Sequence, residues 1–233
     1  MPNIQELASK GIILENHYSQ SVCTPSRGSF MTGRYPINIG LQNGVILNGV
    51  PYGLDTQFSL LPQELERAGY LSHIIGKWHL GICNKRFWPH HRGFNSFYGY
   101  LGGGEGYYDH STRYCSSYFL FLIDGNILRG GYDFRDGDEV NFEVNGTYST
   151  ELFQQRAIDI IENHPEDEPL FLYVPFQSVH EPIEVPDEYV DNFEYVDNEK
   201  RKKYLGMILA MDEAVGNIIK SLEVFAFFST HEP

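Results

Sequence analysis

Two short apolar runs constrain the fold of this 233-residue chain more than any other feature. Residues 71–75 read Leu-Ser-His-Ile-Ile, and residues 170–176 read Leu-Phe-Leu-Tyr-Val-Pro-Phe. Runs of this length and composition are typical of strands that are buried on both faces, as in a parallel sheet. A helical pattern precedes each run, so the elements alternate along the chain. The sequence therefore predicts an α/β fold in which helices cover both faces of a sheet.

Helical spacing and capping signals predict the helices. A short helix is expected over residues 4–10, ended by Gly11, and another over residues 61–68, ended by Gly69. Ser149 is expected to cap a third helix, whose core face consists of Phe153, Ala157, Ile160 and Ile161. A longer helix is expected to bury one stripe, made of Tyr204, Ile208, Met211, Val215, Ile218 and Leu222.

The remaining segments are predicted as strands and loops. Residues 12–18 and 224–230 are apolar and strand-like. Residues 87–148 are rich in Gly, Tyr and Asp and include Gly102-Gly103-Gly104, so we expect loops and short hairpins there. Such loops often set the specificity of a site.

The most informative motif is Cys-Thr-Pro-Ser-Arg-Gly-Ser-Phe-Met-Thr-Gly-Arg, at residues 23–34. Pro25 fits the first turn of a helix, so a helix is predicted from there to Gly33. Cys23 then lies at the helix N-terminus, where backbone N–H groups and the helix dipole favour a thiolate or a bound oxyanion. Arg27 follows one turn later and could contact the same anion. Cys-x-Pro alone would fit a buried cysteine in an ordinary helix equally well.

Two further groups of polar residues follow the apolar runs. Lys77 and His79 come at the end of the first run, and strand alternation predicts both side chains on one face, with Trp78 pointing away. His180 follows the second run, and ligands of open α/β sheets bind beyond the carboxyl ends of the strands. Each group alone would also fit a solvated strand edge or a turn.

Together these segments resemble the sulfatase family. Residues 23–34 match its signature Cys-x-Pro-Ser-Arg followed by Thr-Gly-Arg, and residues 76–81, Gly-Lys-Trp-His-Leu-Gly, match its second motif. His180 matches a histidine of the arylsulfatase branch that includes the N-acetylgalactosamine-4-sulfatases. The other similar segments are residues 92–94 with 98–100, 133–137, 169–173 and 211–216. The resemblance implies an alkaline-phosphatase-like α/β/α sandwich, with residues 1–233 as part of the family's N-terminal catalytic domain.

The resemblance also implies a role for each candidate residue. Cys23 would be oxidised by the formylglycine-generating enzyme to formylglycine, whose aldehyde hydrate attacks sulfur and which is also a calcium ligand. Arg27 would steady this hydrate, and His79 would hold its second hydroxyl. Lys77 and His180 would bind oxygens of the sulfate. The implied activity is calcium-dependent hydrolysis of sulfate esters of glycosaminoglycan sugars or of aryl sulfates, in the lysosome or the extracellular space.

The calcium ligands are where the chain departs from the family pattern. The family binds calcium through an Asp-Asp pair on its first strand and an Asp-Asn pair on a later strand. Residues 1–4 correspond to a point past the first pair, and His231-Glu232-Pro233 stand where Asp-Asn-Gly is expected. Because a hard cation needs several oxygen ligands, we expect this chain to be part of a longer arylsulfatase or an inactive isoform.

Two alternatives to a working sulfatase belong to other classes. A non-catalytic, sulfatase-like isoform would bind sulfated glycans or a partner, and the missing calcium ligands favour it for this chain. A cysteine-based phosphatase needs an arginine six residues after the cysteine, whereas that position holds Ser29. The phosphatase interpretation therefore fails.

Charge and targeting signals narrow the partners. The chain has 17 Lys and Arg against 31 Asp and Glu, a formal net charge of -14, which disfavours nucleic acid and anionic membranes as partners. A local cationic pocket on this acidic background would attract an anionic substrate group. The sequence shows no signal peptide and no membrane span.

The remaining sites concern modification and metal binding. Asn145-Gly146-Thr147 is a potential glycosylation site. Cys83 and Cys115 could pair with each other or with cysteines elsewhere. A zinc site that adds His90 and His91 to these cysteines is conceivable, but the spacing matches no metal-binding pattern.

Overall fold

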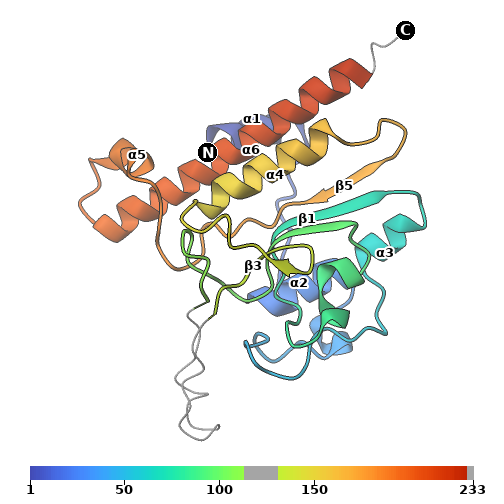
Figure 1. Cartoon of the computed structure of the whole chain (residues 1–233). Helices are drawn as coiled ribbons and strands as arrows, with labels where there is room; N and C mark the ends of the chain where they lie inside the picture. Colours follow the sequence, from blue (N-terminus) through green and yellow to red (C-terminus); the bar gives the residue numbers. More distant parts are fainter. Residues whose placement is uncertain (113–130, 230–233) are drawn as a thin grey trace, which may run out of the picture.

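The computed structural model describes residues 1–112 and 131–229, and within these ranges five strands form one sheet (Figure 1). The strands are β1 (Leu71–Lys77), β2 (Ser96–Tyr100), β3 (Phe134–Asp136), β4 (Glu139–Val140) and β5 (Leu170–Tyr173). Their order across the sheet is β4-β3-β2-β1-β5. Both predicted apolar runs are strands, and they are neighbours in the sheet.

Helices surround the sheet. The α-helices are α1 (Pro2–Lys10), α2 (Cys23–Thr32), α3 (Leu61–Glu66), α4 (Ser149–Glu162), α5 (Asp187–Val190) and α6 (Glu199–Ser229). Short 3-10 helices are η1 (Pro36–Ile39), η2 (Lys85–Phe87), η3 (Pro89–His91) and η4 (Asp191–Phe193). None of the helices in the described ranges combines the length and the apolar character that a membrane-spanning helix needs.

Strand direction brings several loops together at one edge of the sheet. β1 is parallel to both β2 and β5, with Lys77 opposite Tyr100 and Ile74 opposite Tyr173. β3 runs antiparallel to β2 and to β4. Because the carboxyl ends of β1, β2 and β5 meet at the same edge, the residues that follow these three strands become neighbours.

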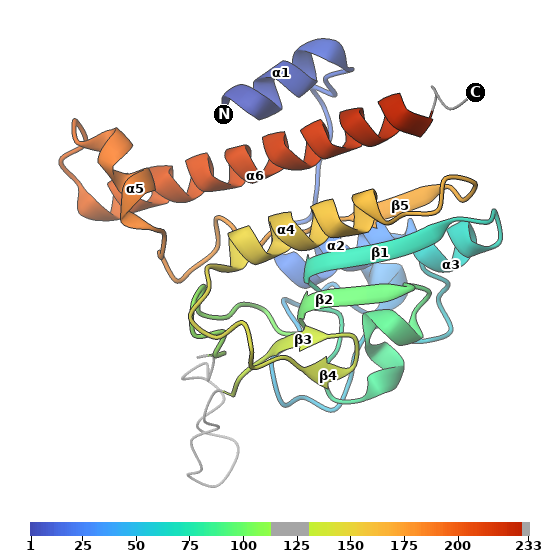
Figure 2. The same ribbon diagram turned by 45° about the horizontal axis from the view of Figure 1, so that its top comes forward.

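Both faces of the sheet are buried. Ile74 and Ile75 are each fully buried, but they belong to different apolar clusters, as adjacent strand residues should. Ile74 shares its cluster with Met31 of α2, whereas Ile75 shares its cluster with Phe153 of α4. Figure 2 shows α4 and α6 over one face and α2 and α3 behind the other. The predicted α/β/α layering is confirmed.

Two predicted strands are wrong. Residues 12–18 form no strand, and Ile12 is 91% exposed, because within the described residues no neighbouring strand pairs with this segment. Residues 224–229 continue α6. Leu222 and Phe225 lie three residues apart and both pack on the α4 side of the core, so helical spacing prevails over the strand-like composition there.

The segment expected to form loops and short hairpins contains the short hairpin of β3 and β4, and it also contains β2, a strand that was not expected. β2 reads Ser-Phe-Tyr-Gly-Tyr within a segment rich in Gly, Tyr and Asp, and its Phe97 and Tyr98 are buried on opposite faces of the sheet. Tertiary burial therefore determines this strand more than its local sequence does. Part of the expected loop region, residues 113–130, lies outside the described residues.

Helix details also differ from expectation. α4 exists as predicted, but Ser149 does not cap it; its hydroxyl donates instead to Oε1 of Gln177, 2.9 Å away. α3 ends at Glu66, and Gly69 follows with a left-handed φ of 84°. Of the predicted stripe, Ile218 is buried and Leu222 packs against the same apolar cluster, but Tyr204 is 40% exposed. The other buried apolar side chains in the described part of α6, Met207, Ala210 and Ala214, lie one residue before members of the stripe. The stripe was ambiguous because α6 packs against α1, α4 and α5 and is apolar on more than one side.

The segment at residues 211–216 has a clear structural purpose. The buried carboxylate of Asp212 accepts hydrogen bonds from the backbone N–H groups of Asn3 and Ile4, each 2.9 Å long. It thereby satisfies two free donors at the start of α1. A side chain at Gly216 would meet Asn3 at 2.6 Å, so glycine is needed where α1 crosses α6. The helix predicted over residues 4–10 is confirmed as α1, which ends at Gly11.

Candidate functional site

Cys23 opens into a cavity of about 410 Å³ at the carboxyl ends of the parallel strands. The cavity is lined by Ser21, Val22, Cys23, Val45, Ile46, Leu47, Asn48, His79, Gly103 and His180. Three of the five predicted site residues, Cys23, His79 and His180, therefore share one cavity although they are far apart in the sequence. The expectation that His180 would emerge at this edge is confirmed.

The local sequence explains the position of Cys23. It is the first residue of α2, and the helix ends at Gly33, whose φ of 65° is left-handed, as predicted. Thr24 was not anticipated: its buried hydroxyl donates to the carbonyl oxygen of His79 and accepts from the N–H of Ile46, each at 3.1 Å. Gly28 lets the helix approach its neighbours, since a Cβ there would meet Leu41 at 2.7 Å. Thr24 thus fixes the start of α2 to the loop that carries His79.

Lys77 and His79 reach the site from different backbone positions. Lys77 is the last residue of β1, is only 2% exposed and donates from its ammonium to the carbonyl oxygen of Gly103. His79 lies past the strand and has a left-handed φ of 61°. Strand alternation therefore does not place His79, although both residues lie close enough to interact electrostatically with Cys23. Trp78 points away into the core, where its indole N–H donates to Phe87.

The site stabilises negative charge on Cys23. Hydrogen bonding to His180 is the main cause that lowers the pKa of the Cys23 thiol to about 4, and the charge of Lys77 adds to this effect. Burial lowers the pKa of Lys77 to about 8, and the nearby charge of Arg27 adds to this effect. An anionic group at position 23 is therefore strongly favoured over a neutral one.

His79 is held in one tautomer. Its Nε2 lies 2.9 Å from the carbonyl oxygen of Ile46, which can only accept, so Nε2 carries the proton. Burial lowers the pKa of His79, which keeps the ring neutral. Nδ1 is then an acceptor, and it is buried without a hydrogen-bond partner. His79 is suited to receive a proton from a group at position 23.

Arg27 does not line the cavity. Its Nη1 donates to the carbonyl oxygen of Lys77, 2.9 Å away, and approaches the hydroxyl of Tyr173 at 3.4 Å. Its Nε is buried without a partner. The structure thus places Arg27 behind the cavity, where it holds the end of β1 and adds positive charge.

Comparisons with known proteins agree with this geometry. The sulfatase family model matches residues 1–224. The chain belongs to the sulfatase family. It is 38% identical to mouse (Mus musculus) arylsulfatase J over 98% of the chain and 36% of that protein. It is 27% identical to human (Homo sapiens) N-acetylgalactosamine-6-sulfatase over 98% of the chain and 44% of that protein. The chain thus spans less than half the length of these two relatives.

Solved structures support the same fold. The crystal structure of Ps i-CgsB matches with a TM-score of 0.84 at 30% identity, over 97% of this chain and 50% of that one. The PsFucS1 sulfatase from Pseudoalteromonas sp. matches with a TM-score of 0.76 at 23% identity, over 97% and 46% of the two chains. The alkaline-phosphatase-like sulfatase fold expected from the motifs is therefore confirmed.

The metal ligands expected for a sulfatase are not met by the described residues. The side chains that line the Cys23 cavity include no Asp or Glu, and the Lys77 ammonium is bound to the carbonyl oxygen of Gly103, one of the lining residues. Within residues 1–112 and 131–229, no three His, Cys, Asp or Glu side chains gather so as to hold a metal ion. This donor set does not fit calcium, which binds through six to eight oxygens.

The remaining predicted sites lie away from the cavity. Cys83 is an exposed free thiol, and Cys115 lies outside the described residues, so their pairing stays a prediction. Asn145 is exposed, as a glycosylated asparagine must be.

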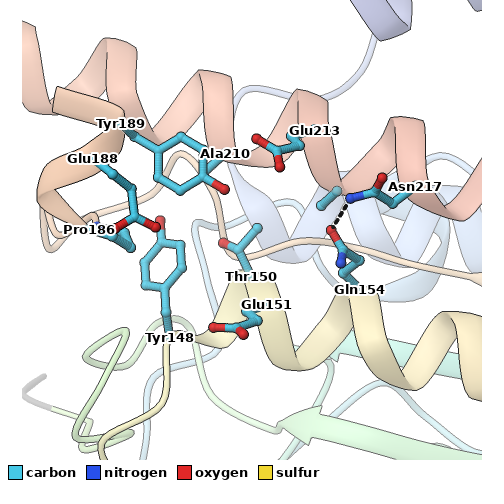
Figure 3. Close-up of a pocket in the computed structure, with 11 residues that line it drawn as sticks. Tyr148, Thr150, Glu151, Gln154, Pro186, Glu188, Tyr189, Ala210, Glu213 and Asn217 are labelled. Atoms are coloured by element: carbon cyan, nitrogen blue, oxygen red, sulfur yellow. Dashed lines mark hydrogen bonds between the residues drawn. The ribbon is translucent and has the colours of Figure 1, made fainter. Parts of the chain in front are cut away.

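A second cavity of about 220 Å³ lies between α4, α5 and α6, and Figure 3 shows the residues around it. The lining includes Glu151, Glu188 and Glu213 together with Tyr148 and Tyr189, and no Lys, Arg or His. At one end, Asn217 Nδ2 donates to Gln154 Oε1 at 3.0 Å. Its acidic lining would repel a sulfate group, so it does not compete with the Cys23 cavity as a sulfatase site.

Proposed function

We propose that the Cys23 cavity hydrolyses sulfate esters. The observation that carries this proposal is the meeting of a helix N-terminus, Lys77, His79 and His180 around Cys23 in a chain of net charge -14. Each of these groups favours an anion or moves a proton, and membership of the sulfatase family supplies the reaction class.

The residues present fit the oxidised form of Cys23, formylglycine. Its hydrate carries two hydroxyls in place of one thiol, and therefore needs more hydrogen-bond partners. Nδ1 of His79 is buried without a hydrogen-bond partner, which leaves an acceptor for one of these hydroxyls. Formylglycine, when formed, supplies the nucleophilic hydroxyl. The formylglycine-generating enzyme is the corresponding partner, and the motif at residues 23–34 is what it would read.

Each side chain of the site then has a separate role in the proposed reaction. Lys77 and His180 bind sulfate oxygens and stabilise the charge that shifts during transfer. His79, neutral and unprotonated at Nδ1, takes the proton of the second hydroxyl at position 23, which allows sulfate to leave. Arg27 holds the carbonyl of Lys77 and so keeps the ammonium next to Gly103, one of the lining residues.

The rim of the cavity suggests the substrate. Val22, Val45, Ile46 and Leu47 make one side of the cavity apolar. Such a wall suits the ring of an aryl sulfate or the apolar face of a sugar better than a free ion. The relatives are named as an arylsulfatase and as an N-acetylgalactosamine-6-sulfatase. We therefore propose sulfated glycosaminoglycan sugars or aryl sulfates as substrates, in the lysosome or the extracellular space. The 4-sulfatase-like preference is proposed from the match of His180 to that branch of the family and not from these relatives.

We assign calcium no role in the proposed reaction, because the described residues do not provide its oxygen ligands. The alternative predicted from the sequence is a sulfatase-like isoform that binds sulfated glycans or a partner without turnover. The two functions share the anion-binding cavity and differ only in whether the ester is cleaved.

The test compares the full chain with Cys23→Ala after co-expression with a formylglycine-generating enzyme. Mass spectrometry of the peptide that contains Cys23 reports conversion to the aldehyde, and hydrolysis of 4-nitrophenyl sulfate reports turnover. In unconverted protein, inorganic sulfate should slow alkylation of Cys23 by iodoacetamide at least about tenfold, because the anion covers the thiolate.

Conversion together with turnover, absent in Cys23→Ala, supports the hydrolase. Protection by sulfate without turnover supports the non-catalytic alternative. Alkylation that sulfate does not slow would show that the cavity binds no sulfate, and it would overturn both functions.

A further inference from the structure

The loop formed by Gly102, Gly103 and Gly104 contacts the site along its whole length. The carbonyl oxygen of Gly103 accepts from the Lys77 ammonium. A Cβ on Gly103 would meet Cε1 of His79 at 2.7 Å, and one on Gly104 would meet Nδ1 of His180 at 3.2 Å. Three of the five predicted site residues are therefore packed against this loop, and no larger residue than glycine fits at its centre.

A buried carboxylate fixes the start of the loop. β3 pairs with β2 so that Phe134 is opposite Tyr100, which puts Asp133 beside the chain just after β2. Oδ2 of Asp133 accepts from the N–H of Gly102 at 2.7 Å, and the side chain is almost completely buried. The antiparallel register thus delivers a strong acceptor to the first residue of the loop.

A buried amide fixes the other end. Nε2 of Gln177 donates to the carbonyl oxygen of Glu105, the residue after the loop. Its Oε1 accepts from the hydroxyl of Ser149, so both ends of the amide are bound and its orientation is set. The N–H of His180 donates to the carbonyl oxygen of Gln177 at 3.0 Å, which links this anchor directly to the site.

We propose that Asp133 and Gln177 are positioning residues: they clamp the loop at residues 102–104 so that the carbonyl of Gly103 aims the Lys77 ammonium into the Cys23 cavity. This inference rests on the proposed function, because it assigns the clamp to sulfate binding by Lys77. A glycine loop has little intrinsic order, and its conformation must come from such anchors. A misplaced ammonium would weaken binding of the anion.

The burial of Asp133 supports a specific role. Its Oδ1 has no hydrogen-bond partner, and Arg135 Nε lies 4.0 Å away. Burial raises the pKa of Asp133 to about 6, against the hydrogen bonds from Gly102 and Leu101 that lower it. Burial of a carboxylate with one unpaired oxygen lowers the stability of the fold. A neutral side chain that accepts the same hydrogen bond from Gly102 would lower it less.

The test uses the full chain labelled with ¹⁵N-lysine. The buried Lys77 ammonium should give a slowly exchanging ¹H–¹⁵N signal, assigned by its absence in Lys77→Met. Asp133→Ala should shift or broaden this signal and raise the Kd for inorganic sulfate about tenfold, the size of one lost hydrogen bond. Asp133→Asn retains an acceptor and should restore both. Asp136→Ala, which removes an exposed carboxylate of β3, is the matched control.

The possible outcomes separate the clamp from the proposed function. If Asp133→Ala does not fold, Gln177→Met releases the other anchor and should give the same spectral change. An unchanged Lys77 signal in either folded variant, with unchanged sulfate affinity, overturns the clamp. A changed signal in a chain that binds no sulfate supports the clamp and contradicts the sulfate function.

Discussion

Two cavities of this molecule, the Cys23 cavity and the α4–α6 cavity, differ in sign of charge and in how their side chains are placed. The Cys23 cavity collects Lys77, His79 and His180 at the ends of parallel strands. The α4–α6 cavity carries Glu151, Glu188 and Glu213 on helices (Figure 3). In a chain with 31 Asp and Glu against 17 Lys and Arg, an acidic cavity is the expected background. The cationic one is the exception, and it identifies the site.

The two cavities also differ in what holds their side chains in position. In the α4–α6 cavity, helix geometry sets the acidic residues, and Glu213 is exposed. Around the Cys23 cavity, the backbone carbonyls of Gly103, Ile46 and Lys77 accept hydrogen bonds from Lys77, His79 and Arg27 and hold these side chains in place. Buried groups act on an anion in a medium of low dielectric, where each is worth more than at the surface. The comparison indicates that sulfate binding depends on the clamped loops more than on the number of charges.

The largest expected effect comes from removing the buried cation. Lys77→Met should weaken binding of inorganic sulfate about a hundredfold, since a charge-assisted hydrogen bond in a dry site is lost. Isothermal titration calorimetry measures the Kd. Glu213→Gln, the charge-removing control in the α4–α6 cavity, should leave that Kd within about twofold. An equal response of both variants would erase the distinction between the cavities.

A smaller effect concerns stability and pH. The folded pKa of Asp133 is raised to about 6 from its ordinary 3.8, so the folded state holds this proton more tightly than the unfolded state between these values. The free energy of unfolding should therefore fall as pH rises from about 4 to about 6, and stay lower above that range.

Asp133→Asn removes this titration, and it should be more stable than the wild type at pH 7 by about 2 kcal/mol and little different at pH 4. Urea unfolding at the two pH values measures the difference. Asp136→Asn on the same strand should leave the pH dependence unchanged. A difference between Asp133→Asn and wild type that is the same at both pH values would show that Asp133 is not a buried titrating acid.

The smallest expected effect tests how closely the loop at residues 102–104 packs against His79. Gly103→Ala would place a Cβ 2.7 Å from the His79 ring, so the loop or the ring must shift and sulfate affinity should fall about tenfold. Gly131→Ala is the control, because nothing lies within 4 Å of its Cβ position. Equal affinities of the two variants would mean that the loop yields freely and does not shape the site.

The sequence predicted much of the fold because burial leaves clear patterns. The runs at residues 71–75 and 170–176 specified two adjacent strands, and the spacing of Phe153, Ala157 and Ile161 specified α4. β2 escaped prediction because its Gly and Tyr residues are stabilised by neighbours that are distant in sequence. Residues 12–18 were misassigned because an apolar composition does not by itself provide a partner strand.

The candidate site was predicted in its residues but not in its construction. Motif spacing identified Cys23, Lys77, His79 and His180, and the structure brings all four together. Thr24, Gly103 and Asp133 gave no separate signal, because a hydroxyl, a glycine and an acid acquire these contacts only through the packing of remote segments.

The sequence by itself determined the family, the layered α/β/α architecture and the chemical identity of the candidate site, since these follow from local periodicity and motif spacing. Only the tertiary structure decided which atoms are available. It commits His79 Nε2 to Ile46, turns Arg27 behind the cavity, and binds Lys77 to a loop held by Asp133. The physical reason is that burial removes water, so each polar group must take a partner from whichever distant segment the fold brings within hydrogen-bonding distance.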